Sequence, residues 1–336
     1  MAMNIYLLAG GGGHTGYAVA LAEALIDLDP SIRDSIVFLV PRNDLWSLWR
    51  IKRRLGKGFP AYMVLKPRNP NEGIYRFLLR TPRSLAESYS VIKNRGLVIG
   101  TGSNFSLYPI LVARIKHLEH VFSVEAIDRI YTSSKANTLL YKYLNTRILL
   151  HWREQLKNYP KGILTGPIVE KPLYEPRDNG YILVTTGSMG HVKLLKKLMK
   201  TSLKNIVVQT GRIDPRIVKA KKPEWIVFSY DPDIDKWIAG ASIVIAHQGL
   251  TIAEAALSYN KPVVLAYNPD LPLTSGYKDS KLLAEKLNAT LINTETIEPD
   301  ELEEQILSTI NKTPPKYPLG SRTAAKYIYD KIINIT

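Results

Sequence analysis

The sequence predicts an α/β fold with two consecutive domains, each built on a parallel sheet. With 336 residues, the chain has a length typical of about two domains. Short apolar runs alternate with stretches of helical periodicity, which is the pattern of parallel strands joined by crossover helices. The alternation begins again near residue 181, after a segment that contains Pro167, Pro172 and Pro176.

In the first half, apolar runs predict strands over residues 4–9, 35–40, 96–99 and 120–123. A glycine-rich turn follows the first strand, and apolar side chains then recur at helical spacing over 17–28. In the second half we expect strands at 181–185, 206–209, 226–229, 241–246 and 262–267, and helices at 193–200, 251–258 and 322–333. The expected division is therefore a first domain over 1–165, a second over 166–312, and a C-terminal segment over 313–336.

Composition excludes several kinds of protein. The chain has no Cys, so it has no disulfide, no thiolate nucleophile and no Cys-ligated metal. Its 45% apolar and 22% charged residues are typical of a globular protein rather than a disordered one. No secretory leader is recognisable, and the best membrane-helix candidate, residues 237–257, is interrupted by His247 and Gln248. We expect a soluble fold.

The net charge of +15 indicates an anionic partner, and much of it lies in one segment. Residues 42–83 hold eleven Lys and Arg against two acidic residues, a net charge of +9, with aromatic and aliphatic side chains between them. This mixture favours an interfacial surface for an anionic membrane, with the candidates Trp46, Trp49, Arg53, Arg54, Phe77 and Arg80. In one alternative, the aromatics belong to the core and the charges are solvated. A nucleic-acid surface is a second alternative, but no recognisable nucleic-acid motif accompanies the segment.

Gly10–Gly16 (GGGGHTG) follows the first strand and opens the first helix, a setting that suits a phosphate group. The glycines also satisfy the dinucleotide pattern, but Pro41 and Arg42 stand where NAD would need an acidic residue. An arginine there leaves NADP as an alternative. His14 is a candidate base or diphosphate ligand, and helix capping is its simpler explanation. Four other histidines have no comparable setting, namely His117, His120, His151 and His191. No spaced cluster predicts a protein-built metal site.

Similar turns follow strands of the second half, in TTGSMG (185–190), QTG (209–211) and HQGLTIAEA (247–255). A helix starting near Thr251 would hold a diphosphate at its N-terminus. Glu254 could then accept hydrogen bonds from both ribose hydroxyls, because a carboxylate suits a vicinal diol. The alternative is a capping box between Thr251 and Glu254.

On these motifs the chain resembles the GT-B glycosyltransferases that extend polyisoprenyl-diphosphate sugars with UDP-GlcNAc. The second half is similar to the catalytic subunit of the eukaryotic dolichol-linked chitobiose synthase and, in GLTIAEA, to bacterial MurG. The first half, with GGGGHT, GTGSNFSLYP and VFSVEAIDRI, is similar to the membrane-recruiting subunit of that synthase. The resemblance implies two Rossmann-like domains facing across a cleft, with the C-terminal helix packing back toward the first. The fused halves and the lack of Cys favour an archaeal source.

The resemblance also implies roles for individual residues. The donor site would comprise Ser188, Gly211, Tyr230, Asp231, His247, Gly249, Leu250, Thr251, Glu254 and Asp279. The acceptor diphosphate would lie against Gly13, Thr15, Gly100, Gly102 and Ser103, with His14 and Glu125 as competing catalytic bases. Ser280 and Lys281 depart from the Gln found in these relatives, so the sugar contact falls to Asp279. The membrane helix common before the recruiting subunit is not expected, because the first strand starts at Asn4.

The implied reaction is inverting transfer of GlcNAc from UDP-GlcNAc to polyisoprenyl (dolichyl)-diphosphate-GlcNAc, forming a β-1,4-linked disaccharide lipid for protein N-glycosylation. It calls for no cofactor, leaves a divalent metal open, and needs no nucleic acid. The expected location is peripheral, at the cytoplasmic face of the cell membrane. A UDP-sugar 2-epimerase of the same fold and a basic nucleic-acid-binding protein are the alternatives.

Overall fold

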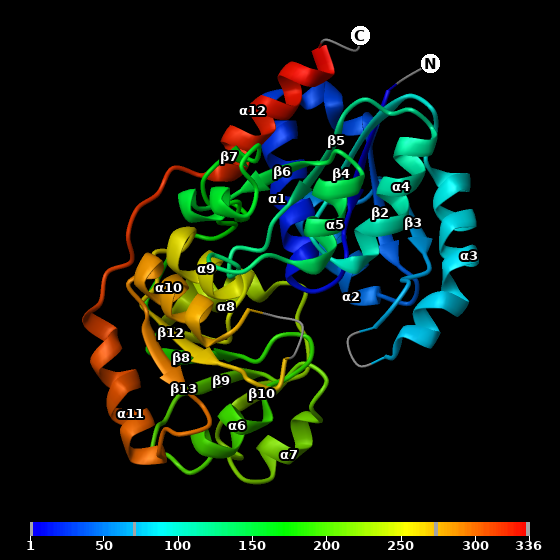
Figure 1. Cartoon of the computed structure of the whole chain (residues 1–336). Coiled ribbons are helices and arrows are strands. Elements are labelled where there is room, and N and C mark those ends of the chain that lie inside the picture. The colour runs from blue at the N-terminus through cyan, green and yellow to red at the C-terminus, as the bar shows by residue number, and fades with distance from the viewer. Residues whose placement is uncertain (1–2, 70–71, 272–274, 334–336) are drawn as a thin grey trace. The chain divides into compact units, whose positions relative to one another are not determined.

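The computed structural model describes residues 3–69, 72–271 and 275–333, and the chain divides into two compact units. Unit 1 comprises residues 1–170 and 318–336, and unit 2 comprises residues 171–317. Each unit is a parallel α/β sheet with helices on both faces (Figure 1). The predicted fold class is therefore confirmed.

The described residues of unit 1 form a seven-stranded parallel sheet in the order β3-β2-β1-β4-β5-β6-β7. Its central strands are fully buried apolar runs, as expected for a sheet that helices cover on both faces. The strands are β1 (Asn4–Leu8), β2 (Ile36–Pro41), β3 (Ala61–Val64), β4 (Gly96–Gly100), β5 (Val121–Val124), β6 (Arg147–Leu150) and β7 (Ile163–Leu164).

In unit 2 the described residues form a six-stranded parallel sheet in the order β10-β9-β8-β11-β12-β13. Both sheets thus carry the doubly wound order in which the chain runs outward from a central strand, first to one side and then to the other. The strands are β8 (Tyr181–Thr185), β9 (Ile206–Gln209), β10 (Ile226–Phe228), β11 (Ala241–Ala246), β12 (Val263–Tyr267) and β13 (Thr290–Asn293).

Crossover helices join these strands. In unit 1 they are α1 (Gly13–Leu28), α2 (Leu45–Leu55), α3 (Ile74–Val91), α4 (Leu107–Ile115) and α5 (Lys135–Tyr143). In unit 2 they are α6 (Val192–Leu198), α7 (Pro215–Lys219), α8 (Ile234–Gly240), α9 (Leu250–Leu257), α10 (Tyr277–Leu287) and α11 (Pro299–Ser308). The basic segment 42–83, which carried no expected element, contains α2, edge strand β3 and the start of α3. Strand β3 was not predicted, and it is an edge strand in which Ala61, Tyr62 and Met63 are exposed.

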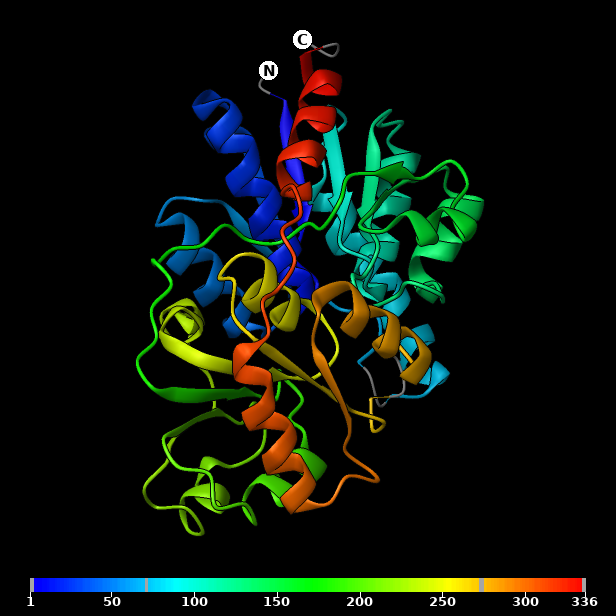
Figure 2. The ribbon, with the colours of Figure 1, turned by 90° about the vertical axis from the view of Figure 1, so that its left-hand side faces the viewer.

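The last helix, α12 (Gly320–Ile333), returns to unit 1 and packs along α1, as Figure 2 shows. The first residue of α12 is closely packed against residues 166–167. Gly320 N donates to Pro167 O at 2.8 Å, and a Cβ at Gly320 would overlap the Gly166 carbonyl. Farther along, Tyr329 donates its hydroxyl hydrogen to Asp29 at 3.0 Å. The prediction that the C-terminal helix packs back toward the first domain is confirmed.

A buried cluster of four charges ties α1 and α2 to the end of unit 1. Arg54 pairs with Glu23 through two hydrogen bonds of 2.8 and 2.7 Å, and Arg50 pairs with Glu170. The side chain of Arg54 has no exposed surface and also approaches Glu170 at 3.8 Å. Arg54 was expected to face a membrane, and the structure corrects this. The helical repeat turns it inward, while neighbouring Arg53 remains exposed.

Replacing Arg54 with Met should lower the free energy of unfolding by about 3–5 kcal/mol, because Glu23 would keep a buried charge without its partner. Arg53→Met is the matched control and should change stability by about 0.5 kcal/mol at most. Urea denaturation of the full chain measures both. Equal effects of the two substitutions would contradict the structural role of the cluster.

Candidate functional site

In unit 1, the glycine-rich turn after β1 lies directly against the loop after β4. A Cβ built on Gly10 would overlap the Ser103 hydroxyl, so the two loops meet only because position 10 has no side chain. Gly11 and Gly12 have positive φ angles of 95° and 56°, which side chains rarely adopt. The helix α1 then begins at Gly13, four residues earlier than expected. The turn therefore brings the N-terminus of α1 to the carboxyl edge of the sheet.

His14 is held in one orientation at this edge. Its Nδ1 donates to the carbonyl oxygen of Thr101, at the end of β4, which leaves Nε2 as the proton acceptor. Desolvation of the ring, and then the positive charge of Lys66, lower the pKa of His14 to about 4. The imidazole is therefore neutral at pH 7. An oriented neutral imidazole is the form that a general base requires.

Two further groups make this edge suitable for an anion. Lys66 Nζ donates to Gly10 O at 3.0 Å, so a cation stands beside the glycine-rich turn. The Ser103 hydroxyl is buried and has no hydrogen-bond partner among the residues that the structure describes. Ser103 was expected here and Lys66 was not, because Lys66 reaches the turn from the loop after β3, a strand that the sequence did not reveal.

The other acceptor-site candidates have identifiable contacts within the fold. The Thr15 hydroxyl is 2.7 Å from the Ser47 hydroxyl and is buried. A Cβ at Gly100 would touch Ile110 and Ser123, so packing requires that glycine. Gly102 has a φ of 81°, and a Cβ there would lie 2.7 Å from Val124 O. These residues shape the loops that present His14 and Ser103.

Glu125, the competing base, lies at the end of β5 and is fully buried. Its carboxylate accepts hydrogen bonds from Ala126 N at 2.8 Å, from Ser134 N at 3.2 Å and from the hydroxyl of Tyr159. Burial nevertheless raises the pKa of Glu125. These contacts brace the turn after β5, and they favour His14 over Glu125 as the group that meets a substrate.

In unit 2, the loops after β8, β9 and β11 pack together. Gly187 and Gly211 have φ angles of 66° and 63°. A Cβ at Gly187 would overlap the ring of His247, and one at Gly211 would overlap the Gly187 carbonyl and approach the backbone of Ser188. Four predicted donor-site features, the TTGSMG turn, Ser188, Gly211 and His247, are thus brought to one edge of the sheet.

His191 also belongs to this edge, although the sequence placed it in no functional setting. It directly precedes α6 and has only 1% of its surface exposed. Burial, and then the proximity of His247, lower the pKa of His191 to about 4. Sequence spacing does not reveal this proximity, because the pairing of β8 with β11 brings the two histidines to the same edge of the sheet.

Helix α9 begins at Leu250 with Gly249 as its N-cap residue and with no side-chain cap. The capping box between Thr251 and Glu254 is therefore excluded. A Cβ at Gly249, whose φ is 141°, would have no atom within 4 Å, so this turn is open. Glu254 is largely buried one turn farther along the helix.

The remaining donor candidates lie at neighbouring strand ends. Asp231, after β10, accepts hydrogen bonds from Trp237 Nε1 at 2.9 Å and Asp233 N at 2.8 Å, and it pairs with Lys236 at 2.9 Å. Partial burial opposes its charge, but the hydrogen bonds from Trp237 and Lys236 lower the pKa of Asp231. The Asp231 side chain is thus occupied, which leaves the backbone at Tyr230 and Asp231 for a ligand. Asp279 is buried in the first turn of α10.

The basic segment of unit 1 presents an apolar surface on α2 and α3. Trp49 is 47% exposed and Arg53 is exposed, whereas Trp46 is half-buried. Phe77 packs on Tyr108 with ring centroids 5.8 Å apart, and Arg80 pairs with Glu72 at 2.6 Å. The most exposed apolar side chains of α3 are instead Ile74, Tyr75, Leu78 and Leu79. We call the exposed residues Leu45, Trp49, Arg53, Ile74, Tyr75, Leu78 and Leu79 the α2–α3 face.

Over residues 3–69, 72–271 and 275–333, no group of three or more His, Asp or Glu is placed to hold a metal ion. Within the same ranges, no helix is both long and apolar enough to cross a membrane.

Comparisons with known proteins agree with this geometry. Residues 181–332 match the glycosyltransferase family 28 C-terminal domain. A curated relative, the UDP-N-acetylglucosamine--N-acetylmuramyl-(pentapeptide) pyrophosphoryl-undecaprenol N-acetylglucosamine transferase of Prochlorococcus marinus (strain MIT 9312), is 23% identical over 338 residues. The match covers 90% of this chain and 85% of the relative.

Solved structures share the fold. MurG of Acinetobacter baumannii superimposes with a TM-score of 0.62 and 18% identity, covering 98% of this chain and all of that one. The UDP-GlcNAc 2-epimerase of Methanocaldococcus jannaschii, in complex with UDP-GlcNAc and UDP, gives 0.61 and 14%, covering 99% and 100%. The fold is GT-B, two Rossmann-like units in one chain. Residues 181–332 thus carry a glycosyltransferase family 28 C-terminal domain, and the chain as a whole is similar to the relative from Prochlorococcus and shares the fold of MurG.

We expect His14 to titrate near pH 4 in the free protein rather than near its ordinary value of 6.5. Lys66→Met should raise that pKa, because it removes a positive charge that disfavours the imidazolium. NMR of labelled histidine follows both titrations, with Lys57→Met, an exposed lysine of the same segment, as the control. A His14 pKa that does not respond to Lys66→Met would contradict the proximity of the two groups.

Proposed function

We propose that the protein transfers GlcNAc from UDP-GlcNAc to polyisoprenyl-diphosphate-GlcNAc with inversion of the anomeric centre. The observation that carries the proposal is the neutral, oriented imidazole of His14 beside a glycine-rich turn, in a chain whose other unit is a family 28 domain. The name of the Prochlorococcus relative supports the donor and the lipid-diphosphate class of the acceptor, since that enzyme is named for transfer of N-acetylglucosamine from UDP-N-acetylglucosamine to an N-acetylmuramyl-(pentapeptide) pyrophosphoryl-undecaprenol.

In the proposed mechanism, unit 1 holds the acceptor. The diphosphate lies against the N-terminus of α1, with Lys66 and the Ser103 hydroxyl as further partners. His14 Nε2 removes the proton of the acceptor 4-hydroxyl as that oxygen attacks C1 of the donor sugar. The new C1–O4 bond forms while the bond from C1 to the UDP oxygen breaks, and the proton stays on His14. In-line displacement yields the β linkage.

Unit 2 holds the donor. The open turn Gly249–Thr251 at the start of α9, together with Ser188 and Gly211, receives the UDP diphosphate. Glu254 accepts both ribose hydroxyls, and the backbone at Tyr230 and Asp231 meets the uracil. Leu250, His247 and Asp279 complete the site, with Asp279 directed to the sugar. Stabilisation of the departing diphosphate by backbone N–H groups requires no cofactor.

The acceptor is lipid-linked, so the enzyme must work at a membrane surface. The α2–α3 face combines exposed apolar side chains with the basic segment 42–83, as a peripheral interfacial surface requires. We propose that this face docks on the anionic cytoplasmic face of the cell membrane. We further propose that the polyisoprenol is dolichol and that the β-1,4-linked disaccharide lipid serves protein N-glycosylation, on the similarity of both halves to the chitobiose synthase subunits.

The GT-B fold alone does not distinguish this activity from that of a UDP-sugar 2-epimerase, since both kinds of enzyme share it. The family 28 domain favours the transferase. The polar groups at the glycine-rich turn of unit 1 also favour it, because an acceptor with its own diphosphate needs a second anion site.

His14→Ala should lower kcat for GlcNAc transfer by roughly 10²–10⁴-fold, the usual contribution of a positioned general base. UDP binding, measured by calorimetry, should be unchanged because His14 lies in unit 1. In the wild type, kcat/KM should stay flat as pH falls toward 5 and drop near pH 4, where His14 gains its proton. Wild-type kcat in the alanine variant would remove His14 from the mechanism.

Glu254→Ala should chiefly affect donor binding. It should weaken UDP-GlcNAc binding by roughly 10- to 100-fold, since two hydrogen bonds to a carboxylate are lost. Glu304→Ala, a change of the same type in exposed α11, is the control. Calorimetry with UDP-GlcNAc and with uracil separates the ribose contact from the base contact. An unaltered donor Kd would refute the ribose assignment.

A further inference from the structure

Unit 2 carries a second basic segment, which extends beyond helix α6. Residues 193–222 contain ten Lys and Arg against the single acidic residue Asp214, a net charge of +9 in 30 residues. Together with residues 42–83 this exceeds the charge of the whole chain, so the remaining residues are slightly acidic. The positive charge therefore has two separate origins, one in each unit.

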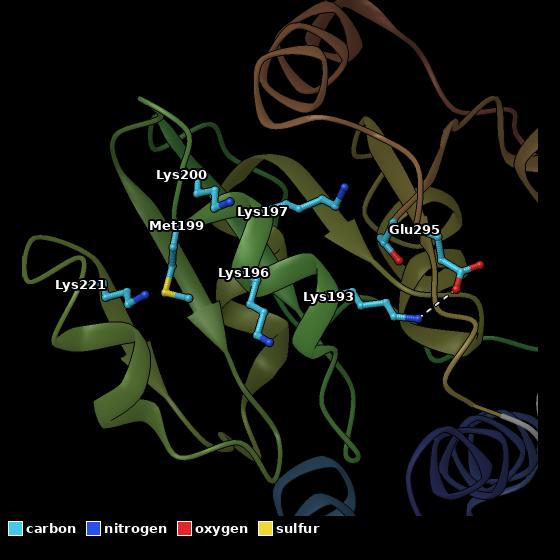
Figure 3. Close-up of a pocket in the computed structure, with 8 residues that line it drawn as sticks. Lys193, Lys196, Lys197, Met199, Lys200, Lys221 and Glu295 are labelled. Carbon is cyan, nitrogen blue, oxygen red and sulfur yellow. Dashed lines mark hydrogen bonds and ion pairs between the residues drawn. The ribbon is translucent and has the colours of Figure 1, made fainter.

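Part of this segment surrounds a surface pocket of about 540 Å³ at helix α6 (Figure 3). Lys196 and Lys200 come from α6 and its C-terminal end, and Lys221 follows α7. In the view of Figure 3, Lys196 and Lys221 lie on either side of the half-buried Met199. The pocket is lined by Lys193, Lys196, Lys197, Met199, Lys200, Lys221, Thr294 and Glu295.

The lysines of the pocket differ in how they are neutralised. Lys193 is paired with Asp270 at 2.8 Å and Glu295 at 3.0 Å. Lys197 donates to the carbonyl oxygen of Ile297. Lys196, Lys200 and Lys221 have no ion pair or hydrogen bond from their ammonium groups to any described residue. Three ammonium groups therefore line the pocket without a salt bridge to another part of the described chain, while the acidic residue of the lining, Glu295, is paired with Lys193.

Helix electrostatics explain only some of these residues. Lysines in the last turn of α6 favourably face the negative end of its dipole. Lys221 comes from a different element and gains nothing from that dipole, while it adds repulsion to the cluster. An anion bound among Lys196, Lys200 and Lys221 would relieve the repulsion. Lysine stems and Met199 give the pocket apolar walls as well.

We propose that this lysine pocket binds the phosphate groups of anionic phospholipids and gives unit 2 its own contact with the membrane. Among the residues that the structure describes, none that lines the pocket is an aromatic on which a nucleic-acid base could stack, which argues against RNA or DNA. Val192 and Ile217, 48% and 56% exposed, supply apolar groups on the same two helices. The proposal rests on the proposed function only in that a lipid-linked acceptor brings the enzyme to a membrane.

The test is vesicle sedimentation with the full chain, using phosphatidylcholine vesicles with and without phosphatidylglycerol. At about 1 kcal/mol for each lysine near an anionic surface, Lys196→Gln, Lys200→Gln and Lys221→Gln together should weaken partitioning by roughly 100-fold. The matched control replaces three exposed lysines elsewhere, Lys142, Lys316 and Lys326, with Gln. The control should lose far less, and added salt should reduce the difference.

Each other outcome would overturn the proposal. If the two triple variants lost vesicle binding equally, the loss would be due to the lower net charge and not to the pocket. Calorimetric binding of free tripolyphosphate that only the pocket variant loses, with vesicle binding unchanged, would assign the pocket to a soluble phosphate. Loss of binding to an oligonucleotide, again with vesicle binding unchanged, would assign it to nucleic acid.

The outcome is separable from that of the proposed function. The pocket lies outside the residues assigned to transfer, so the pocket variant should retain wild-type kcat on an acceptor presented in detergent. A wild-type protein that binds anionic vesicles through the pocket but transfers no GlcNAc would disprove the proposed function alone. A wild-type protein that transfers GlcNAc, with a pocket variant that binds vesicles as well as the wild type does, would disprove the membrane role of the lysine pocket alone.

Discussion

Parallel pairing is the constraint on which both halves of the molecule depend. When neighbouring strands run in the same direction, their carboxyl ends meet at one edge of the sheet, and the loops that follow them converge there. In unit 1 this brings the turn after β1 to the loop after β4, and in unit 2 it collects the loops after β8, β9 and β11. Glycines then permit contact distances that a Cβ would forbid, as at Gly10 and Gly187.

This constraint also explains how much could be predicted. The strands with continuous apolar runs, their order along the chain and the glycine turns were all recognisable in sequence, and so was His14 at the first turn. Lys66 and His191 were missed because each reaches its partner through strand pairing, and no local pattern records that. Arg54 was wrongly predicted to face a membrane. A segment rich in Arg and Trp indicates an interface, but only the orientation of helix α2 shows which of its arginines is buried.

The two faces of α2 show how one short helix combines stability with a surface role. Its inward arginines, Arg50 and Arg54, are neutralised by Glu170 and Glu23, while its outward side carries Trp49 and Arg53. Paired charges of this kind stabilise the fold only while both partners are present. Unpaired lysines on unit 2 are the opposite case, since their charge is left for a partner outside the chain. The net charge of +15 is thus the sum of buried, paired charges and of exposed, unpaired charges on separate surfaces.

The proposed reaction joins a UDP-activated sugar to a hydroxyl group of a lipid-linked sugar. The most direct measurement is mass spectrometry, with NMR of the linkage, on the product formed from UDP-GlcNAc and synthetic polyisoprenyl-diphosphate-GlcNAc. We expect a lipid-linked disaccharide that is heavier than the acceptor by one N-acetylhexosamine residue and joined by a β-1,4 bond, with one UDP released for each disaccharide formed. Conversion of UDP-GlcNAc into its 2-epimer, with the lipid unchanged, would contradict the proposed reaction.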